Sequence, residues 1–293
     1  MEEITYLERP VLVKPYLIVG FEGWPNAGEI SSFALRHLVD SLGAREFAFI
    51  PTENFYQMSS LRPMAVIKDG RVIELKSSGN HFYYVKGLPS NDLILFSGVE
   101  PHLRWNVFAD LILELAEGFH VTQIFTIGGT YDYVPHTYPP VVSGLFNHEE
   151  LRERVVRAGL GLTEYSGPIS IHTFILEAAR KRNLDAISLW GHVPQYLQTR
   201  NVKVVCSLLK RLTDLTGIKI DLADLEKAGD YFDQQIHQLV EEDPKLQEVI
   251  SKLEEIYKGS ERIRQPLGKE KGPRQDKVVY VQAFLKKSED EKK

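Results

Sequence analysis

The stretch "LIVGFEGWPNAGEISSFALRHLVDSLG", residues 17–43, changes from a strand pattern to a helix pattern at a short polar elbow. Residues 17–21 are an apolar run of strand length. Pro25 then stops the strand and disfavours helix at the residue before it. Beyond the elbow, apolar residues recur at helical spacing until Gly43. The stretch therefore predicts a strand, a tight turn and an amphipathic helix, which is the repeating unit of α/β folds.

The elbow also resembles a phosphate-binding turn, because a helix start attracts anions. Asn26 is a good N-cap residue, and Glu29 stands three residues later, where a carboxylate can reach back to the cap. However, neither the G-x-G-x-x-G nor the G-x-x-x-x-G-K-[ST] pattern is present, and Glu22 and Glu29 would repel a phosphate. The elbow is interpreted as a capped turn, with a ligand contact as the alternative.

Composition limits the class of protein. The 293 residues, 43% of them hydrophobic, can build one large α/β domain with an appendage. Lys and Arg number 35 against 40 Asp and Glu, which argues against a nucleic-acid or anionic-membrane partner. The one cysteine, Cys206, has apolar neighbours typical of an inert buried thiol, so a disulfide framework is excluded. Since no signal-peptide pattern or apolar run of ~20 residues is visible, we expect a cytoplasmic protein.

Strand and helix patterns alternate along most of the chain. Strands are expected at 17–21, 45–50, 92–98, 121–129, 141–147 and 185–191, and a hairpin over 64–76 turns at Asp69-Gly70. Residues 81–87 are expected to join that hairpin as a third antiparallel strand. Helices are expected at 30–42, 104–119, 148–160, 172–183 and around Cys206. This order predicts an α/β fold with a mostly parallel sheet covered by helices on both faces.

The chain is predicted to have three parts: an α/β core over 1–218, a helical hairpin over 219–258 and a flexible charged tail over 259–293. In the second part, Asp243 is the expected N-cap and Pro244 the first residue of the second helix. This αα-hairpin either packs on the core or projects as an arm towards another chain. In the tail, an apolar island at 278–284 suggests a docking segment.

The candidate site lies where the parallel strands end, because ligands bind at the carboxyl ends of such strands. The strand ends read Glu22-Gly23-Trp24, Ser97-Gly98-Val99-Glu100, Gly128-Gly129-Thr130 and Gly191-His192-Val193-Pro194. Small residues next to a polar or aromatic residue are typical of a ligand-binding crevice, but they are equally typical of any tight turn between a strand and a helix. The candidate ligand or partner contacts are Glu22, Trp24, Asn26, Gly128, Gly129, Thr130, Tyr131 and His192.

Catalytic and metal-binding patterns are weak. The nine histidines show no metal-ligand spacing, and no G-x-S-x-G elbow supports a hydrolase triad. His102, His136 and His192 follow strand ends and could act as acids or bases, but a structural role fits each better. No catalytic residue, metal or cofactor is predicted. The tyrosines of the loop after Gly129 (Tyr131, Tyr133 and Tyr138) either form a protein contact surface or pack on the sheet.

Five stretches resemble the proteasome assembly chaperone 2 family, in the family's order: "GFEGWPNAGEISS", "DLILFSGVEPHLRW", "TIGGTYDYVPHT", "EYSGPISIHTFILEAARKRN" and "ISLWGHVPQYL". The resemblance covers roughly residues 10–260. It implies an α/β sandwich similar to nucleoside phosphorylases and related hydrolases, a helical C-terminal region and homo-oligomers. Eukaryotic relatives escort proteasome α-subunits into rings and are not enzymes.

The tail departs from one pattern of the family. Some archaeal relatives end in a hydrophobic-Tyr-X motif whose terminal carboxylate enters a pocket of the proteasome α-ring. Here Val279-Tyr280-Val281 lies inside the chain, which ends in "SEDEKK". Without a free carboxylate beside Tyr280, docking by the tail loses its charge-assisted contact.

Two functions are therefore considered. The first is a non-enzymatic, homo-oligomeric protein-binding module resembling a proteasome assembly chaperone, with proteasome α-subunits as candidate partners. The alternative is an enzyme or sensor that binds a small ligand in the strand-end crevice, lined by Glu22, Trp24, Asn26, Thr130 and His192. Since fold alone does not imply function, the choice between these two functions depends on the geometry of the site.

Overall fold

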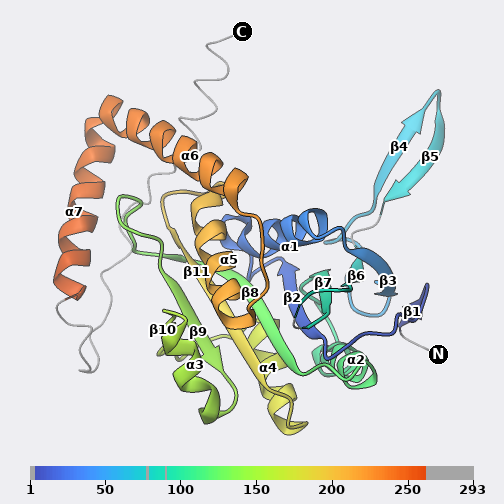
Figure 1. Cartoon of the computed structure of the whole chain (residues 1–293). Coiled ribbons are helices and arrows are strands. Elements are labelled where there is room, and N and C mark those ends of the chain that lie inside the picture. The colour runs from blue at the N-terminus through green and yellow to red at the C-terminus, as the bar shows by residue number, and fades with distance from the viewer. Residues whose placement is uncertain (1–3, 77–78, 90, 262–293) are drawn as a thin grey trace.

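The computed structural model describes residues 4–76, 79–89 and 91–261, and within them one large mixed sheet forms the centre of the protein (Figure 1). Its strand order is β1-β3-β6-β7-β2-β8-β11-β9-β10. The central strands β7, β2, β8 and β11 are parallel, and β1, β3, β6 and β9 add antiparallel pairings at the two sides. The strands are β1 (Thr5–Tyr6), β2 (Tyr16–Glu22), β3 (Arg45–Ile50), β6 (Asn80–Val85), β7 (Leu93–Val99), β8 (Gln123–Asp132), β9 (Val142–Phe146), β10 (Gly161–Leu162) and β11 (Ala186–Pro194).

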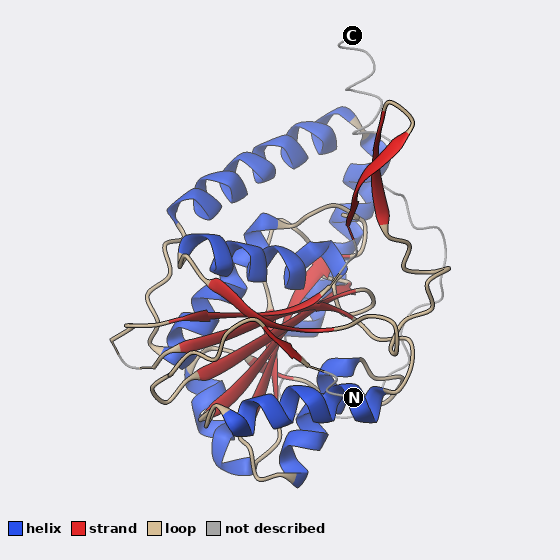
Figure 2. Ribbon diagram, turned by 90° about the vertical axis from the view of Figure 1, so that its right-hand side faces the viewer, coloured by secondary structure: helices blue, strands red, loops and turns tan. Residues whose placement is uncertain are grey.

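Helices cover both faces of this sheet, as the sequence predicts (Figure 2). On one face, α1 (Ile30–Ser41), α3 (Arg152–Arg157) and α5 (Val202–Thr216) bury their apolar sides in one core cluster. On the other face, α2 (Trp105–Gly118) and α4 (Ile171–Lys181) build a second, phenylalanine-rich cluster. The strands of the parallel centre are buried almost continuously, because both of their faces are covered.

The elbow between β2 and α1 differs in detail from the prediction. Residues Ala27–Glu29 form a 3₁₀ turn, and Gly28 and Glu29 both have positive φ angles, of 59° and 53°. These two residues delay the helix, so α1 begins at Ile30. The Asn26 side chain reaches past the turn and accepts a hydrogen bond from the Ser32 amide (3.0 Å). The Glu29 carboxylate does not reach back to Asn26 but pairs with Arg200 (2.7 Å).

The elbow lies directly against strand β8. The Gly129 amide donates to the Pro25 carbonyl (2.8 Å), and Asn26 forms a parallel β-bridge with Gly129. A Cβ atom at Gly129 would lie 2.4 Å from the Ala27 carbonyl oxygen. Only glycine leaves room for this approach, so Gly129 lets the turn close over the sheet.

The hairpin β4 (Met64–Lys68) and β5 (Arg71–Lys76) forms as predicted, but residues 81–87 do not join it. They form β6, which pairs with β3 and β7 inside the main sheet. The reason is burial, because Phe82 and Tyr84 place their rings in the core between the sheet and α2. The β4–β5 hairpin projects away from the body of the molecule (Figure 1).

Two helices follow the sheet, α6 (Ala223–Glu242) and α7 (Pro244–Glu261). α6 packs on α5, where Lys210 pairs with Glu226 (2.7 Å). Asp243 caps α7 as predicted, since its carboxylate accepts from the Lys245 and Leu246 amides. A small apolar cluster joins both helices to Tyr196 and Leu197, which follow β11. Within the described ranges, none of the helices has the length and apolar character needed to cross a membrane.

Residues 262–293 lie outside the described residues, and with them the apolar island and Val279-Tyr280-Val281. The predicted docking role of this segment stays a prediction.

We expect Gly129→Ala to destabilise the protein by about 3 kcal/mol, because the new methyl group must push the elbow away from β8. Gly118→Ala is the matched control. Its Cβ meets nothing within 4 Å, and alanine is the better helix former at the end of α2. Urea unfolding followed by circular dichroism measures both. Equal stability of the two variants would contradict the account of the elbow.

Candidate functional site

The strand ends surround a pocket of about 520 Å³, and three of the predicted contacts, Trp24, Thr130 and His192, line it. Strands β9 and β11 add Ser143, Leu145 and Trp190 to the wall. The opposite wall is the segment before α4 together with the first turn of that helix (Thr163, Tyr165, Ser166, Gly167, Pro168, Ile169, Ser170 and Thr173). The volume of the pocket suits a small organic ligand.

The sheet register brings a serine, a histidine and an aspartate together beside this pocket. His192 on β11 lies opposite Thr130 on β8, so Asp132, two residues on, points to the same face of the sheet. On the other side, Trp190 lies opposite Ser143 of β9, which places Ser143 diagonally across from His192. Three adjacent strands thus each contribute one polar side chain to one short row.

These three side chains form a continuous hydrogen-bond chain. The His192 Nδ1 atom lies 2.7 Å from Asp132 Oδ2, and its Nε2 atom lies 2.8 Å from Ser143 Oγ. Because a carboxylate can only accept, Nδ1 is assigned the proton, and Nε2 then accepts from the serine hydroxyl. The Tyr133 amide donates to the second carboxylate oxygen of Asp132 (2.7 Å) and holds it in place. This order of groups is the one that activates a serine in acyl transfer.

Sequence reasoning missed Asp132 and Ser143. The G-x-S-x-G signature is absent because Ser143 lies within strand β9 and not on a strand-to-helix elbow. The strand pattern places a histidine at the end of β11, but only the pairing of β11 with both β8 and β9 shows which residues face it. Polar residues at alternate positions of these strands were a usable signal, because they lie on one face of the sheet. That signal can be interpreted only once the order of the strands is known.

The other predicted contacts lie elsewhere. Glu22 is exposed at the end of β2, and Asn26 is occupied with Ser32. Gly128 and Gly129 are buried beneath the elbow, and Tyr131 points outward with 43% of its surface exposed. The pocket wall contains none of these five residues.

Of the remaining candidate acids and bases, several have structural partners. His102 accepts a hydrogen bond from the Gln57 amide (3.1 Å). His136 is buried against the Tyr196 hydroxyl (2.6 Å), and burial lowers its pKa to about 4. Glu100 accepts from the Ile171 amide (2.9 Å) at the start of α4, and burial raises the pKa of its carboxyl group. Glu53 is exposed.

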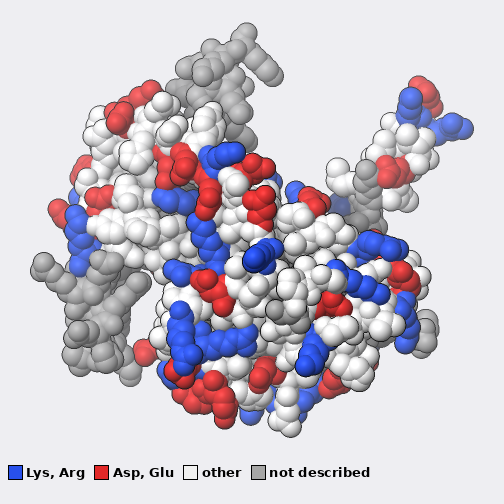
Figure 3. All heavy atoms as spheres, in the orientation of Figure 1, with Lys and Arg blue, Asp and Glu red and all other residues white. Residues whose placement is uncertain are grey.

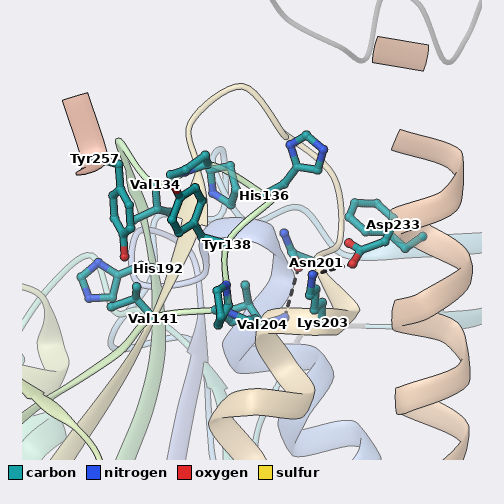
Figure 4. A pocket seen from close by; sticks show the side chains of 15 residues that line it. Val134, His136, Tyr138, Val141, His192, Asn201, Lys203, Val204, Asp233 and Tyr257 are labelled. Carbon is teal, nitrogen blue, oxygen red and sulfur yellow. Dashed lines mark hydrogen bonds and ion pairs between the residues drawn. The ribbon is translucent and has the colours of Figure 1, made fainter. Parts of the chain in front are cut away.

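A second cavity lies between the strand ends and helices α6 and α7 (Figure 4). His136, Tyr138, Lys203 and Tyr257 surround it, and Lys203 pairs with Asp233 of α6. Its volume of about 20 Å³ is enough for a single water molecule. Tyr138 packs on Tyr257 of α7 with ring centroids 5.0 Å apart. Of the loop tyrosines, Tyr138 therefore packs down, whereas Tyr131 and Tyr133 stay exposed.

Charge and metal ligands give no further site. Basic and acidic side chains are interspersed over the face of the described residues seen in Figure 3. Among those residues, no three His, Cys, Asp or Glu side chains are grouped to hold a metal ion. Cys206 is buried, and burial raises the pKa of its thiol, so the thiolate is disfavoured.

Comparison with known proteins identifies the family. The profile of the PAC2 family matches residues 20–240. The chain belongs to the PAC2 family. No curated protein matches its sequence.

Solved structures agree with this membership. A PAC2 family protein from Streptomyces avermitilis is 29% identical, with a TM-score of 0.73, over 80% of this chain and 99% of that one. A proteasome-assembly chaperone homologue from Mycobacterium tuberculosis has the same identity, coverage and TM-score. An archaeal proteasome activator from Pyrococcus furiosus shares the fold at 22% identity, with a TM-score of 0.66, over 82% of this chain and 99% of that one.

One buried histidine beneath the pocket makes stability depend on pH. His172 is fully buried between Phe21 and Trp190, and neither of its ring nitrogens has a hydrogen-bond partner among the described residues. Burial lowers its pKa to about 3. In the unfolded chain the group titrates near 6.5, so below that pH the unfolded state binds more protons. Above pH ~6.5 this histidine does not lower the free energy of unfolding. Below that pH the free energy of unfolding decreases as the pH falls, until the pH reaches the folded-state pKa.

We expect His172→Leu to be less sensitive to acid than the wild type. Through His172 alone, the free energy of unfolding of the wild type should decrease by about 2–3 kcal/mol between pH 7 and pH 4.5. The variant should not show this decrease. Urea unfolding at the two pH values measures the difference. His120→Asn, at an exposed histidine with positive φ, is the control and should behave as the wild type. Equal acid losses in all three proteins would refute the assignment.

Proposed function

We propose that this protein is a protein-binding module of the assembly-chaperone type that acts as a homo-oligomer, with proteasome α-subunits as its partners. Membership in the PAC2 family carries the proposal, and the 29% identity to a proteasome-assembly chaperone homologue supports it. A cytoplasmic location agrees with this role, as does the single buried thiol of Cys206.

The projecting hairpin β4–β5 supports self-association. Its register places Ala65 opposite Leu75 and Ile67 opposite Val72, so one face of the hairpin is entirely apolar. Ile67, Val72 and Leu75 are 60–69% exposed. An isolated two-stranded hairpin is marginally stable in water, and exposed apolar faces mark interaction sites. A second copy of the chain would cover this face.

Helix α7 supports binding of another protein. Leu246, Ile250 and Tyr257, on one side of the helix, are buried against the chain itself. Val249 and Ile256, two turns apart, stay exposed, Ile256 by 58%. Both alternatives for the two helices thus find support, because one side packs on the core and the other presents apolar residues. This outer face is the proposed contact with α-subunits.

We expect Ile67→Asp to convert the oligomer into a smaller species, because a charge on the apolar face of the hairpin would be desolvated in the interface. Native mass spectrometry of the purified protein measures the change. Val156→Asp, which places the same charge at an exposed apolar position of α3, should leave the assembly intact. A monomeric wild type, or an unchanged mass for Ile67→Asp, would contradict this use of the hairpin.

Mixed with proteasome α-subunits, the wild type should form a defined complex, and Ile256→Asp should weaken it about tenfold or more. Ser251→Asp is the matched control, because it adds the same charge at an exposed position on another side of α7. Native mass spectrometry with a dilution series gives the affinities. If the wild type forms no mixed complex, the chaperone proposal is wrong.

A further inference from the structure

We propose that Ser143 is the nucleophile of an ester-hydrolysing site, with His192 as its general base and Asp132 as the residue that positions the imidazole. The observation behind this is their juxtaposition. Two hydrogen bonds of 2.8 and 2.7 Å join the three side chains in the order that acyl transfer requires, beside a pocket of about 520 Å³. This activity goes beyond the protein-binding role.

The pocket makes the serine reachable and indicates the class of substrate. Ser143 and His192 both belong to the lining. Around them the wall is aromatic and aliphatic, formed by Trp24, Trp190 and Tyr165 together with Leu145 and Ile169. Among the described residues that line the pocket, none is a Lys or Arg that would pair with a phosphate or carboxylate. These features suit a neutral carboxylic ester with an aryl or short acyl group.

The opposite wall can stabilise negative charge. Ser170 and Thr173 of the N-terminal turn of α4 line the pocket, and the first amides of a helix have no acceptor inside it. The Ile171 amide donates to Glu100 and the Phe174 amide to the Ser170 carbonyl, which leaves the amides of His172 and Thr173. A developing substrate oxyanion would supply the acceptor that these amides lack inside the helix.

The chemical step follows from these positions. Ser143 Oγ attacks the ester carbonyl carbon while its proton passes to His192 Nε2, which gives a tetrahedral intermediate. The bond to the leaving alcohol then breaks, and that alcohol takes the proton from His192. The same nitrogen then deprotonates a water molecule, which attacks the carbonyl carbon of the acyl group on Ser143. The bond between that carbon and Ser143 Oγ breaks, the proton returns from His192 to Oγ, and the carboxylic acid is released. Asp132 stays ionised throughout and keeps the proton on Nδ1.

A fluorophosphonate probe tests the nucleophile directly. We expect the full-length wild type to gain one probe mass, and peptide mapping to place it on Ser143. Ser143→Ala should abolish this adduct, while Ser251→Ala, at an exposed serine of α7 outside this pocket, should keep it. An unlabelled wild-type Ser143 overturns the proposal, whatever the folding of the variants.

Hydrolysis of p-nitrophenyl butyrate tests the roles of Ser143 and Asp132 in the reaction. Ser143→Ala should reduce the enzyme-dependent rate to background, and Asp132→Asn should lower kcat by about 10²–10⁴-fold with KM unchanged. Asp132→Glu should restore part of kcat, which a merely structural role would not predict. Wild-type hydrolysis at the background rate, or full activity in Ser143→Ala, refutes the assignment. These variants leave the outer face of α7 untouched, so the result is separable from α-subunit binding.

Discussion

The contact between the elbow and strand β8 is the constraint on which the rest of the structure depends. The Gly129 amide and the Pro25 carbonyl meet at 2.8 Å, and a side chain at Gly129 would collide with the Ala27 carbonyl. Because the turn closes this tightly, Ile30 of α1 reaches the core between β8 and α5. The same closure leaves Trp24 outside, at the mouth of the pocket. The elbow resembles a phosphate-binding loop in sequence, but in the structure it packs against the backbone of β8 at Gly129.

The sheet is parallel at its centre and antiparallel at its sides, and this mixture produces the site. An entirely parallel sheet would need a crossover before every strand. Here β9 returns antiparallel next to β11, which places Ser143 beside the carboxyl end of a parallel strand. A histidine at that end therefore meets partners from both neighbours. The pocket is closed from the other side by the segment that leads into α4.

The exposed apolar surface is divided between two distant elements. The β4–β5 hairpin and the outer side of α7 lie at different ends of the molecule in Figure 1. The hydrogen-bonded serine lies apart from both, at the strand ends. Self-association, partner binding and ester chemistry would therefore use three separate surfaces, and the loss of one need not affect the others.

The sequence by itself determined the local elements and the class of fold. Apolar periodicity, Pro25, Asp69-Gly70 and Asp243-Pro244 predicted the strands, helices, hairpin and cap, because these signals depend on neighbouring residues alone. Tertiary structure decided that residues 81–87 leave the hairpin for the main sheet, since burial of their rings outweighs a short local connection. It also decided the site. Trp24, Thr130 and His192 were predictable as strand-end residues, but Ser143 and Asp132 were not, because only strand order and register bring residues 49 and 60 positions away to His192.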